Sequence, residues 1–450
     1  MSKHELKNSI IIGFALFAVF FGAGNLIFPP AIGIVSGTHW VTAIAGLTLS
    51  AILLPIITVF AISNMGGETE HLCRPVAPWF SFVYLVFFVL FVGFLGVPRQ
   101  GGTAIESGLF GLFPALREMK LSLFFGLVVY FSIVFYLNCN PTKIVDRVGS
   151  ILTPFLLVIL LYIIFMSVVR PIGVPLENGM EGTFTNAFLT GYQTGDVVVG
   201  IVVASMFVAS IRDHGYTEKK SMMRMTFQAA VVAFLGLLLV YGGLLYLGAT
   251  GAKHFSPDMD QTDLLISLVK MSVGSIGSSA LSVAIFLACL TTTTGIVSSM
   301  ANMVFRMSKG KIPYKLVVAL SCLIGVAVGT IGVSAIVKIS FPTFFLIYPV
   351  SIVLAFLGAF KRFVPNHGGW KGAVLMAAVI GVYDAIAAFN DMGTLHISMG
   401  PLETLYKMIP LSGYGIAWLI PSLVGLVVGC LVVKAGHGPA YPMIPDEENA

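Results

Sequence analysis

The sequence FALFAVFFGAGNLIFPPAIG, residues 14–33, is apolar enough for lipid, yet Gly22, Gly24 and Asn25 interrupt its middle. Glycine adopts non-helical dihedral angles easily and lets a ligand approach the backbone. An unwound turn frees N–H and C=O groups, which are costly in hydrocarbon unless protein, water or a ligand satisfies them. With the proline pair that follows, these residues predict a membrane helix broken at Gly22-Ala23-Gly24-Asn25. The alternative is a small-residue packing face, which needs no ligand.

A break of this kind can hold an anion and a cation side by side. The half-helix that restarts offers its N–H groups and the positive end of its dipole to an anion. The half-helix that stops offers carbonyl oxygens to a cation. The first span therefore predicts a site for a carboxylate and a sodium ion.

The composition of the whole chain indicates an integral membrane protein. Of 450 residues, 57% are apolar and 10% are charged, whereas about 25% of an average soluble domain is charged. Apolar runs near or above 18 residues recur, as in transmembrane helices, whereas a barrel would show roughly ten-residue alternating segments. The five cysteines are scattered without CxxC spacing, which argues against a disulfide framework or a metal knot. We expect an all-α membrane protein.

The apolar runs predict twelve transmembrane helices. They form two five-helix units, 1–169 and 185–358, followed by two additional helices in 372–434 and a tail, 435–450. The predicted spans are 9–35, 40–63, 79–108, 121–137, 148–169, 185–211, 226–249, 275–305, 315–331, 334–358, 372–390 and 411–434.

Basic residues predict the orientation in the membrane. They concentrate in the loops that share a side with the N-terminus, among them Lys143, Arg147, Lys219 and Arg306. Cytoplasmic loops carry the excess of lysine and arginine. We therefore expect a multi-pass protein of the plasma membrane with both termini, and the tail, in the cytoplasm.

Motifs of membrane enzymes and of ATP-driven pumps are missing from the sequence. It has no HExxH, GxSxG or GxxxxGK[ST] motif. All eight histidines lie in predicted loops or near span ends, and none is spaced from another as a metal ligand within a helix. We expect neither an enzyme nor an organic cofactor.

A second interruption lies in the sixth predicted span, at Gly191–Asp196 within NAFLTGYQTGDVVVGIVVASMF, residues 186–207. Spans one and six begin the two five-helix units. Discontinuities at corresponding positions of two halves are typical of inverted-repeat transporters, whose site lies near the middle of the membrane. The alternative is that span six begins after Asp196 and that Gly191–Asp196 is an outer loop.

The eighth predicted span carries ACLTTTTGIVSS, residues 288–299. Ala288, Thr291 and Thr292 have i, i+3, i+4 spacing and share one helix face. Two hydroxyls and a carbonyl form a hard, neutral oxygen cluster that suits Na⁺ if further carbonyls complete the shell. The alternative is that each hydroxyl bonds back to its own helix, as membrane threonines often do.

Three ionisable residues inside predicted spans are candidate coupling or gating residues. Arg99 and Glu106 lie seven apart in span three, and Asp196 lies in the predicted break of span six. Ionisable groups within the membrane are functional candidates. Arg99 and Glu106 form either a gate or a structural pair, and a buried carboxylate offers a place for a coupling proton.

The first-span motif, together with VPRQGGTAIE at 97–106, resembles the branched-chain amino acid:cation symporters, the BrnQ-type or LIVCS permeases. The resemblance extends over most of the chain. It implies the LeuT-type fold with a five-plus-five inverted repeat and discontinuous helices one and six. It also implies import of leucine, isoleucine and valine with Na⁺ or, in some proposals, with H⁺.

The resemblance to the wider fold also implies roles for single residues. Ala18 and Phe21 would donate carbonyls to a sodium ion whose shell Ala288, Thr291 and Thr292 complete. The substrate would bind at the two breaks, and the freed carbonyls of the second would receive its amine. The predicted substrate-binding residues are Gly22, Ala23, Gly24, Asn25, Tyr192, Gln193, Thr194 and Gly195.

Three functions follow from these observations. The first is Na⁺ symport of branched-chain amino acids by alternating access. The second keeps the fold but couples transport to protons through an acid such as Glu106 or Asp196. The third is a channel or a membrane sensor, but a channel favours pore-lining repeats and a sensor normally carries a soluble output domain. The partners we expect are a small amino acid and the lipid bilayer, not nucleic acid.

Overall fold

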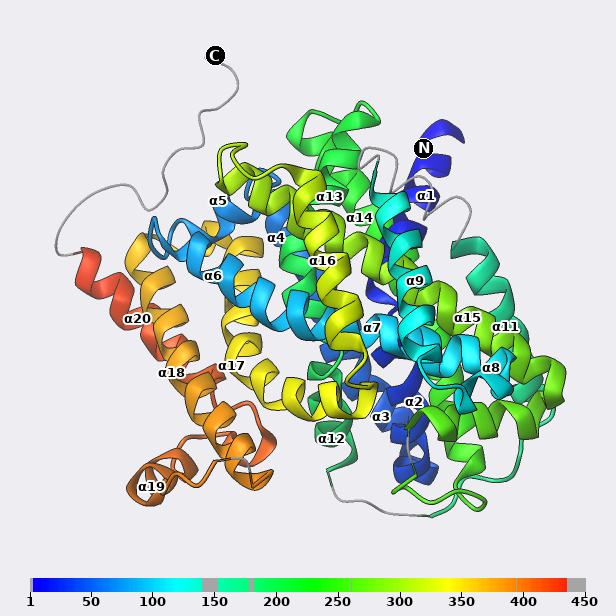
Figure 1. Ribbon diagram of the computed structural model, residues 1–450. Helices are drawn as coiled ribbons and strands as arrows, with labels where there is room; N and C mark the ends of the chain where they lie inside the picture. Colours follow the sequence, from blue (N-terminus) through cyan, green and yellow to red (C-terminus); the bar gives the residue numbers. More distant parts are fainter. Residues whose placement is uncertain (1–2, 140–152, 178–181, 260, 394, 435–450) are drawn as a thin grey trace.

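The computed structural model describes residues 3–139, 153–177, 182–259, 261–393 and 395–434. Within these ranges every regular element is a helix (Figure 1). The predicted tail, 435–450, and the first residues of predicted span five, 148–152, lie outside the described residues.

The first part of the chain folds into a series of apolar helices, and two π-helical segments, Val89–Gly96 and Ala104–Leu109, flank the short helix α7. The helices are α1 (Lys3–Phe20), α2 (Ala23–Ser36), α3 (Trp40–Thr48), α4 (Leu54–Asn64), α5 (Thr69–Cys73), α6 (Phe80–Phe88), α7 (Val97–Thr103), α8 (Phe110–Leu112), α9 (Ser122–Asn138) and α11 (Thr153–Val169).

The second part of the chain contains the longest helices. In α15 the positive φ of Gly274, 76°, separates two helical parts. The helices are α12 (Thr183–Tyr192), α13 (Asp196–Asp213), α14 (Lys219–Gly251), α15 (Gln261–Met307), α16 (Tyr314–Gly329), α17 (Val333–Ala359), α18 (His367–Asp391), α19 (Gly400–Lys407) and α20 (Leu419–Lys434).

The first predicted break is present, slightly earlier than the sequence indicates. Helix α1 ends at Phe20 and α2 begins at Ala23, so Phe21 and Gly22 form the interruption. Gly22 has extended dihedral angles, φ −98° and ψ −168°. The proline pair does not end the segment, because Pro29 and Pro30 both lie inside α2.

The second break separates α12 from α13. The two helices meet at an angle of 48°. Gln193, Thr194 and Gly195 connect them, and Gly195 has a left-handed φ of 78°, which glycine adopts without a steric penalty. Because α12 is helical from Thr183 to Tyr192, the residues before the break form a half-helix and not an outer loop.

Helices α13, α14 and α15 surround the first break. Helix α2 packs against α14 and α15, and α1 contacts the same two helices as well as α13. Glycines allow this close approach: an added methyl group at Gly33 or Gly248 would collide with the backbone of the opposite helix. Helices α18 and α20 pack against each other, and α18 also contacts α17 (Figure 1).

The described chain contains six helices that are long and apolar enough to cross a membrane, or eight if each sharply bent pair counts as one span. Every predicted span overlaps a helix, but twelve crossings are not reached. Helices α9, α11 and α20 have only 16 or 17 residues. In addition, 24–64 is one helical stretch that includes part of the first predicted span and all of the second.

Candidate functional site

Two threonines of α15 contact the end of α1. The hydroxyls of Thr291 and Thr292 lie 3.1 and 3.0 Å from the carbonyl oxygen of Ala18, and both hydroxyls donate to it. Thr291 also donates to the carbonyl of Ala288, at 3.0 Å. These residues are buried. The structure thus gathers four oxygens from two helices, and neither helix alone supplies all of them.

The next two threonines have different partners. The hydroxyl of Thr293 lies 2.8 Å from the hydroxyl of Tyr130 on α9. Thr294 donates to Leu290 of its own helix, at 2.7 Å. Back-bonding within the helix therefore accounts for Thr294 and for one of the two contacts of Thr291. It does not account for Thr292, and both Thr291 and Thr292 also reach across to Ala18 of α1. Phe21, the other predicted carbonyl donor, lies in the interruption, and its own N–H donates to Phe17 at 2.8 Å.

A polar network joins the two breaks. The amide of Asn25, on α2, donates to the carboxylate of Asp196 at 2.6 Å, and it also bonds the hydroxyl of Tyr241 on α14. Asp196 is the first residue of α13, where the positive end of the helix dipole stabilises a carboxylate. All three residues are at most 4% exposed. The network fixes the start of α2 relative to the start of α13.

Tyrosines hold the second break from the other side. The hydroxyl of Tyr348, on α17, lies 3.5 Å from the carbonyl oxygen of Gly191 and 3.4 Å from the N–H of Val197, and these two residues lie on opposite sides of the break. The ring of Tyr192 stacks on that of Tyr348 at 4.4 Å, and its hydroxyl accepts from Trp418 at 3.3 Å. These contacts tie α12 and α13 to α17.

Arg99 and Glu106 have separate partners. Arg99, on α7, donates to the carbonyl of Gln193 over 3.4 Å, whereas Glu106 accepts from the N–H of Val333 at the start of α17. Ala104–Leu109 is π-helical, so the spacing of seven residues no longer places the two side chains on one helical face. The predicted structural pair is not among the ion pairs of the described residues.

The predicted substrate residues therefore lie around one centre. Gly22 and Gly24 face α7: an added methyl group would lie 2.6 Å from the side-chain nitrogen of Gln100 at Gly22, and 3.5 Å from Nη2 of Arg99 at Gly24. Ala23 begins α2 beside them, and Thr194 donates to Gly191 at 2.8 Å.

Sequence reasoning did not identify Gln100, Tyr241, Tyr348 or Trp418 as part of this centre. A lone polar or aromatic residue in an apolar run gives no indication of its partner. Of these four residues, only Gln100 had a signal in the sequence: it stands next to Arg99 in span three.

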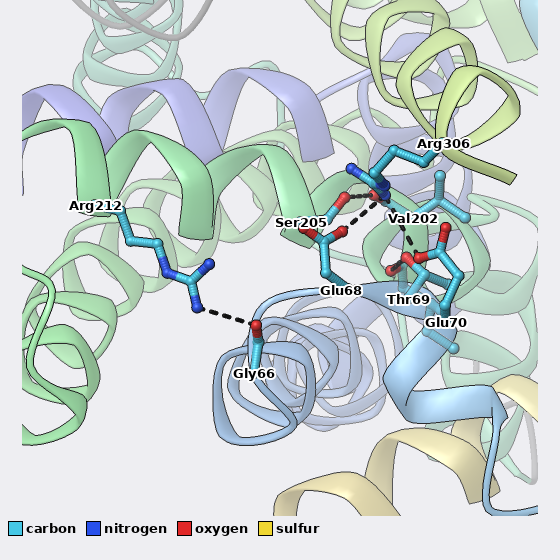
Figure 2. Close-up of polar contacts among 9 residues, drawn as sticks. Gly66, Glu68, Thr69, Glu70, Val202, Ser205, Arg212 and Arg306 are labelled. Atoms are coloured by element: carbon cyan, nitrogen blue, oxygen red, sulfur yellow. Dashed lines mark hydrogen bonds and ion pairs between the residues drawn. The ribbon is translucent and has the colours of Figure 1, made fainter. Parts of the chain in front are cut away.

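A second polar group lies where α4, α13 and α15 end, and we name it the Glu68–Arg306 cluster: Gly66, Glu68, Thr69, Glu70, Arg212 and Arg306 (Figure 2). The guanidinium of Arg306 lies 2.9 Å from Glu68 and 3.5 Å from Glu70. Arg212 donates to the carbonyl of Gly66 at 3.0 Å, and Thr69 donates to that of Ile201 at 2.9 Å. The cluster ties the segment after α4 to α13 and α15.

Burial shifts two pKa values in and beside this cluster. It raises the pKa of Glu68 above the ordinary 4.5, because the desolvation of its charge outweighs the attraction of Arg306. It lowers the pKa of the neighbouring His71 below 6.5, again mainly through desolvation. The cluster is therefore sensitive to protons at its carboxylate side.

The sequence comparisons agree with the resemblance of the first span. A family profile described as "Branched-chain amino acid transport protein" matches residues 5–436. The chain is 33% identical over 435 residues to the branched-chain amino acid permease BraB of Bacillus subtilis, and the match covers 95% of this chain and 96% of that protein. It is 31% identical over 441 residues to the permease BrnQ of Escherichia coli, covering 96% and 97%.

Solved transporter structures share the fold. MhsT in complex with L-phenylalanine is 16% identical, with 95% of this chain and 98% of that chain covered, and superposes with a TM-score of 0.56. For a Na⁺-coupled sialic acid symporter the coverage is 96% and 90% at 13% identity, with a TM-score of 0.59. A mutant of the Eremococcus coleocola manganese transporter reaches a TM-score of 0.63 at 16% identity, covering 94% and 95%.

The chain shares the fold of these transporters. The family and the relatives are transport permeases by name rather than enzymes. The apolar helices and the family together indicate a multi-pass membrane protein. The chain belongs to the branched-chain amino acid transport protein family.

Proposed function

We propose that this chain imports leucine, isoleucine and valine by Na⁺ symport with alternating access. The observation that carries the proposal is the meeting of α1 and α15: two threonine hydroxyls lie within 3.1 Å of the Ala18 carbonyl, immediately before the first break. Oxygen ligands without charge suit a hard monovalent cation. The sodium ion would bind there, with Ala288 and Phe21 supplying further carbonyls.

The substrate would bind between the two breaks, at Gly22–Asn25 and Tyr192–Gly195. A zwitterion needs an anion site and a cation site, and an aliphatic side chain needs an apolar pocket. Such a pocket separates leucine from valine by only about 1–3 kcal/mol per methylene. One transporter for all three substrates is therefore expected.

Coupling between sodium and substrate would follow because both bind to the interrupted first helix. The sodium ion would order the end of α1, and the substrate would bind to the same interrupted helix, so each ligand raises the affinity for the other. Rocking of one helix bundle against the other would then expose the site alternately to each side. We propose twelve spans in a five-plus-five inverted repeat with two additional helices, in the plasma membrane and with both termini in the cytoplasm.

In this orientation the Glu68–Arg306 cluster lies on the cytoplasmic side. It joins the segment after α4, in the first five-helix unit, to α13 and α15, in the second. These parts must separate for release into the cell. We propose that the cluster closes the cytoplasmic side and opens when the substrate leaves.

A second candidate is proton coupling in the same fold. Asp196 favours it, because a carboxylate that is 4% exposed and lies at the second break could carry a proton. A channel or a sensor has weaker support, since relatives that match nearly the whole chain are permeases by name.

The test is leucine uptake into proteoliposomes that contain only this protein. An inward sodium gradient and an inward proton gradient are imposed separately, each with the membrane voltage clamped. Accumulation under the sodium gradient alone is the expected result. Accumulation under the proton gradient alone would replace Na⁺ symport by the second candidate, and no accumulation under either would overturn both.

A further inference from the structure

Arg99 lies between the two helix breaks. Nη1 donates to the carbonyl of Gln193 in the second break. A methyl group added at Gly24, next to the first break, would lie 3.5 Å from Nη2. The Nε of Arg99 is buried and has no hydrogen-bond partner within the described chain. The guanidinium therefore faces both interruptions with part of its donor capacity unused.

Asp196 provides the opposite charge at the same centre. Asp196 is the first residue of α13, and its carboxylate accepts a hydrogen bond from the amide of Asn25. Arg99 and Asp196 are 6% and 4% exposed, and each influences the other electrostatically. Nevertheless, the ion pairs of the described residues do not include one between them.

Two opposite charges that are buried near each other without contact are costly. Each has lost its hydration, and that cost is recovered only through a partner with good geometry. Charged groups within the membrane usually pair with one another and mark substrate pathways. A ligand that carries both a carboxylate and an ammonium group would satisfy the two charges at once.

We propose that Arg99 binds the α-carboxylate of the substrate and that Asp196 binds its α-ammonium group. This inference rests on the proposed amino acid transport and goes beyond it by assigning the two charged contacts to side chains. Phe28 and Phe344 then border the aliphatic part, since Phe28 lies against Gly24 and Phe344 against Gly195. The arrangement selects α-amino acids and disfavours ligands that lack either charge.

The test crosses two variants with two analogues. Binding of leucine, of leucinamide, which lacks the carboxylate, and of 4-methylpentanoate, which lacks the ammonium group, is measured in purified wild type, Arg99→Gln and Asp196→Asn. Removing one partner of a buried charge pair weakens binding by roughly 30-fold or more. Arg99→Gln should lose that factor for leucine but change leucinamide binding by less than about threefold.

Asp196→Asn should show the reverse selectivity. It should lose leucine binding by a similar factor and leave 4-methylpentanoate binding nearly unchanged. Arg99→Lys, which keeps a positive charge without the planar fork, should recover part of the loss in Arg99→Gln. The matched control is Thr103→Val, one turn further along the same chain segment, where the hydroxyl only donates back to the carbonyl of Arg99.

The outcomes separate this proposal from the proposed function. Equal losses for leucine and leucinamide in Arg99→Gln would mean that the arginine only holds the break together, and the proposal would fail. Unchanged leucine binding in Arg99→Gln would also overturn it. Wild type that binds no leucine at all would instead refute the proposed function. Thermal unfolding and gel filtration of each variant establish that it is folded.

Discussion

At the helix breaks, Arg99 and Asp196 are almost completely buried and form no ion pair with each other within the described chain. In the Glu68–Arg306 cluster, by contrast, Arg306 contacts two carboxylates while its side chain stays 34% exposed. The first arrangement leaves charges for a partner that comes and goes. The second pairs its charges with one another within the protein, as expected of a contact that must form and open repeatedly, although Nε and Nη2 of Arg306 have no hydrogen-bond partner in the described chain.

The difference also predicts how strongly each region responds to mutation. When a buried charge loses one of its few partners, the free energy of binding or folding changes by several kcal/mol. Ion pairs between partly exposed side chains, such as those of Arg306, contribute less, about 0–1 kcal/mol each where solvent screens them. Changes at the breaks should therefore abolish binding, whereas changes in the Glu68–Arg306 cluster should alter the rates of opening.

The largest effect is expected from Gly24→Leu. The first added carbon would lie 2.8 Å from the ring of Phe28, and the rest of the side chain would fill the space beside Arg99. We expect leucine binding to fall by more than about 100-fold, while overpacking costs about 1–3 kcal/mol of stability. Equilibrium binding of radiolabelled leucine measures the loss.

The control for this variant is Gly400→Leu, at a glycine with open space around it. It should bind leucine as wild type does. Normal leucine binding in a folded Gly24→Leu variant would assign the first-span glycines to helix packing and remove them from the substrate site.

The next largest effect is expected at the contact between α1 and α15. Thr291→Ala or Thr292→Ala removes one oxygen from the proposed sodium shell, at a cost of about 1–2 kcal/mol, so the sodium concentration for half-maximal leucine uptake should rise roughly tenfold. Thr294→Ala serves as the control, because its hydroxyl bonds only within its own helix. Unchanged sodium dependence in both variants would contradict the proposed ion site.

A smaller effect is expected from Arg306→Gln, which removes both ion pairs of the Glu68–Arg306 cluster. Opening of the cluster can be followed by maleimide labelling of Cys73, a buried cysteine on α5, with the other cysteines replaced. Labelling should accelerate by roughly three- to tenfold, as expected from the loss of two partly exposed ion pairs. The exposed Arg74, on the same segment, gives the control variant Arg74→Gln. Equal acceleration in both variants would exclude a specific role for Arg306.

The smallest effect is the pH dependence of the same cluster. Because the pKa of Glu68 is raised above 4.5 in the closed cluster, protonation favours the closed state. This contribution is fully present below pH 4.5 and is lost as the pH rises through the raised pKa. Hydrogen exchange of residues 64–73, corrected for intrinsic rates, should show protection that increases as the pH falls from neutral toward 4.5.

Glu68→Gln should lose that increase. The lowered pKa of His71 acts in the opposite direction, but it is common to both proteins, so their difference isolates Glu68. The same pH dependence in wild type and Glu68→Gln would refute the assignment.

Local sequence patterns predicted much of the central region. Apolar runs indicated helix positions that overlap the observed helices, and the glycines at 22 and 195 marked the two interruptions. Spacing alone placed Thr291 and Thr292 on one face. These features are encoded locally, since a break or a helix face depends on residues only a few positions apart.

Features that depend on distant segments could not be predicted. The partners of Asn25 and Arg306 come from residues far away in the chain. The π-helical segments around α7 redirect Arg99 and Glu106 to separate partners, although regular helical spacing predicted one face. The proline pair, which follows the predicted break and on sequence grounds favours it, lies within α2, where packing against α14 and α15 supports the helix.

The most direct test of the sodium site is reciprocal binding. Binding of radioactive Na⁺ to purified wild type and to Thr291→Ala is measured with and without saturating leucine. The ion site proposed at Ala18, Thr291 and Thr292 predicts that leucine raises the affinity of wild type for sodium. Thr291→Ala should bind sodium more weakly than wild type, and leucine should raise its sodium affinity by a smaller factor. Sodium binding that is equal in the two proteins, or that leucine leaves unchanged in wild type, would contradict it.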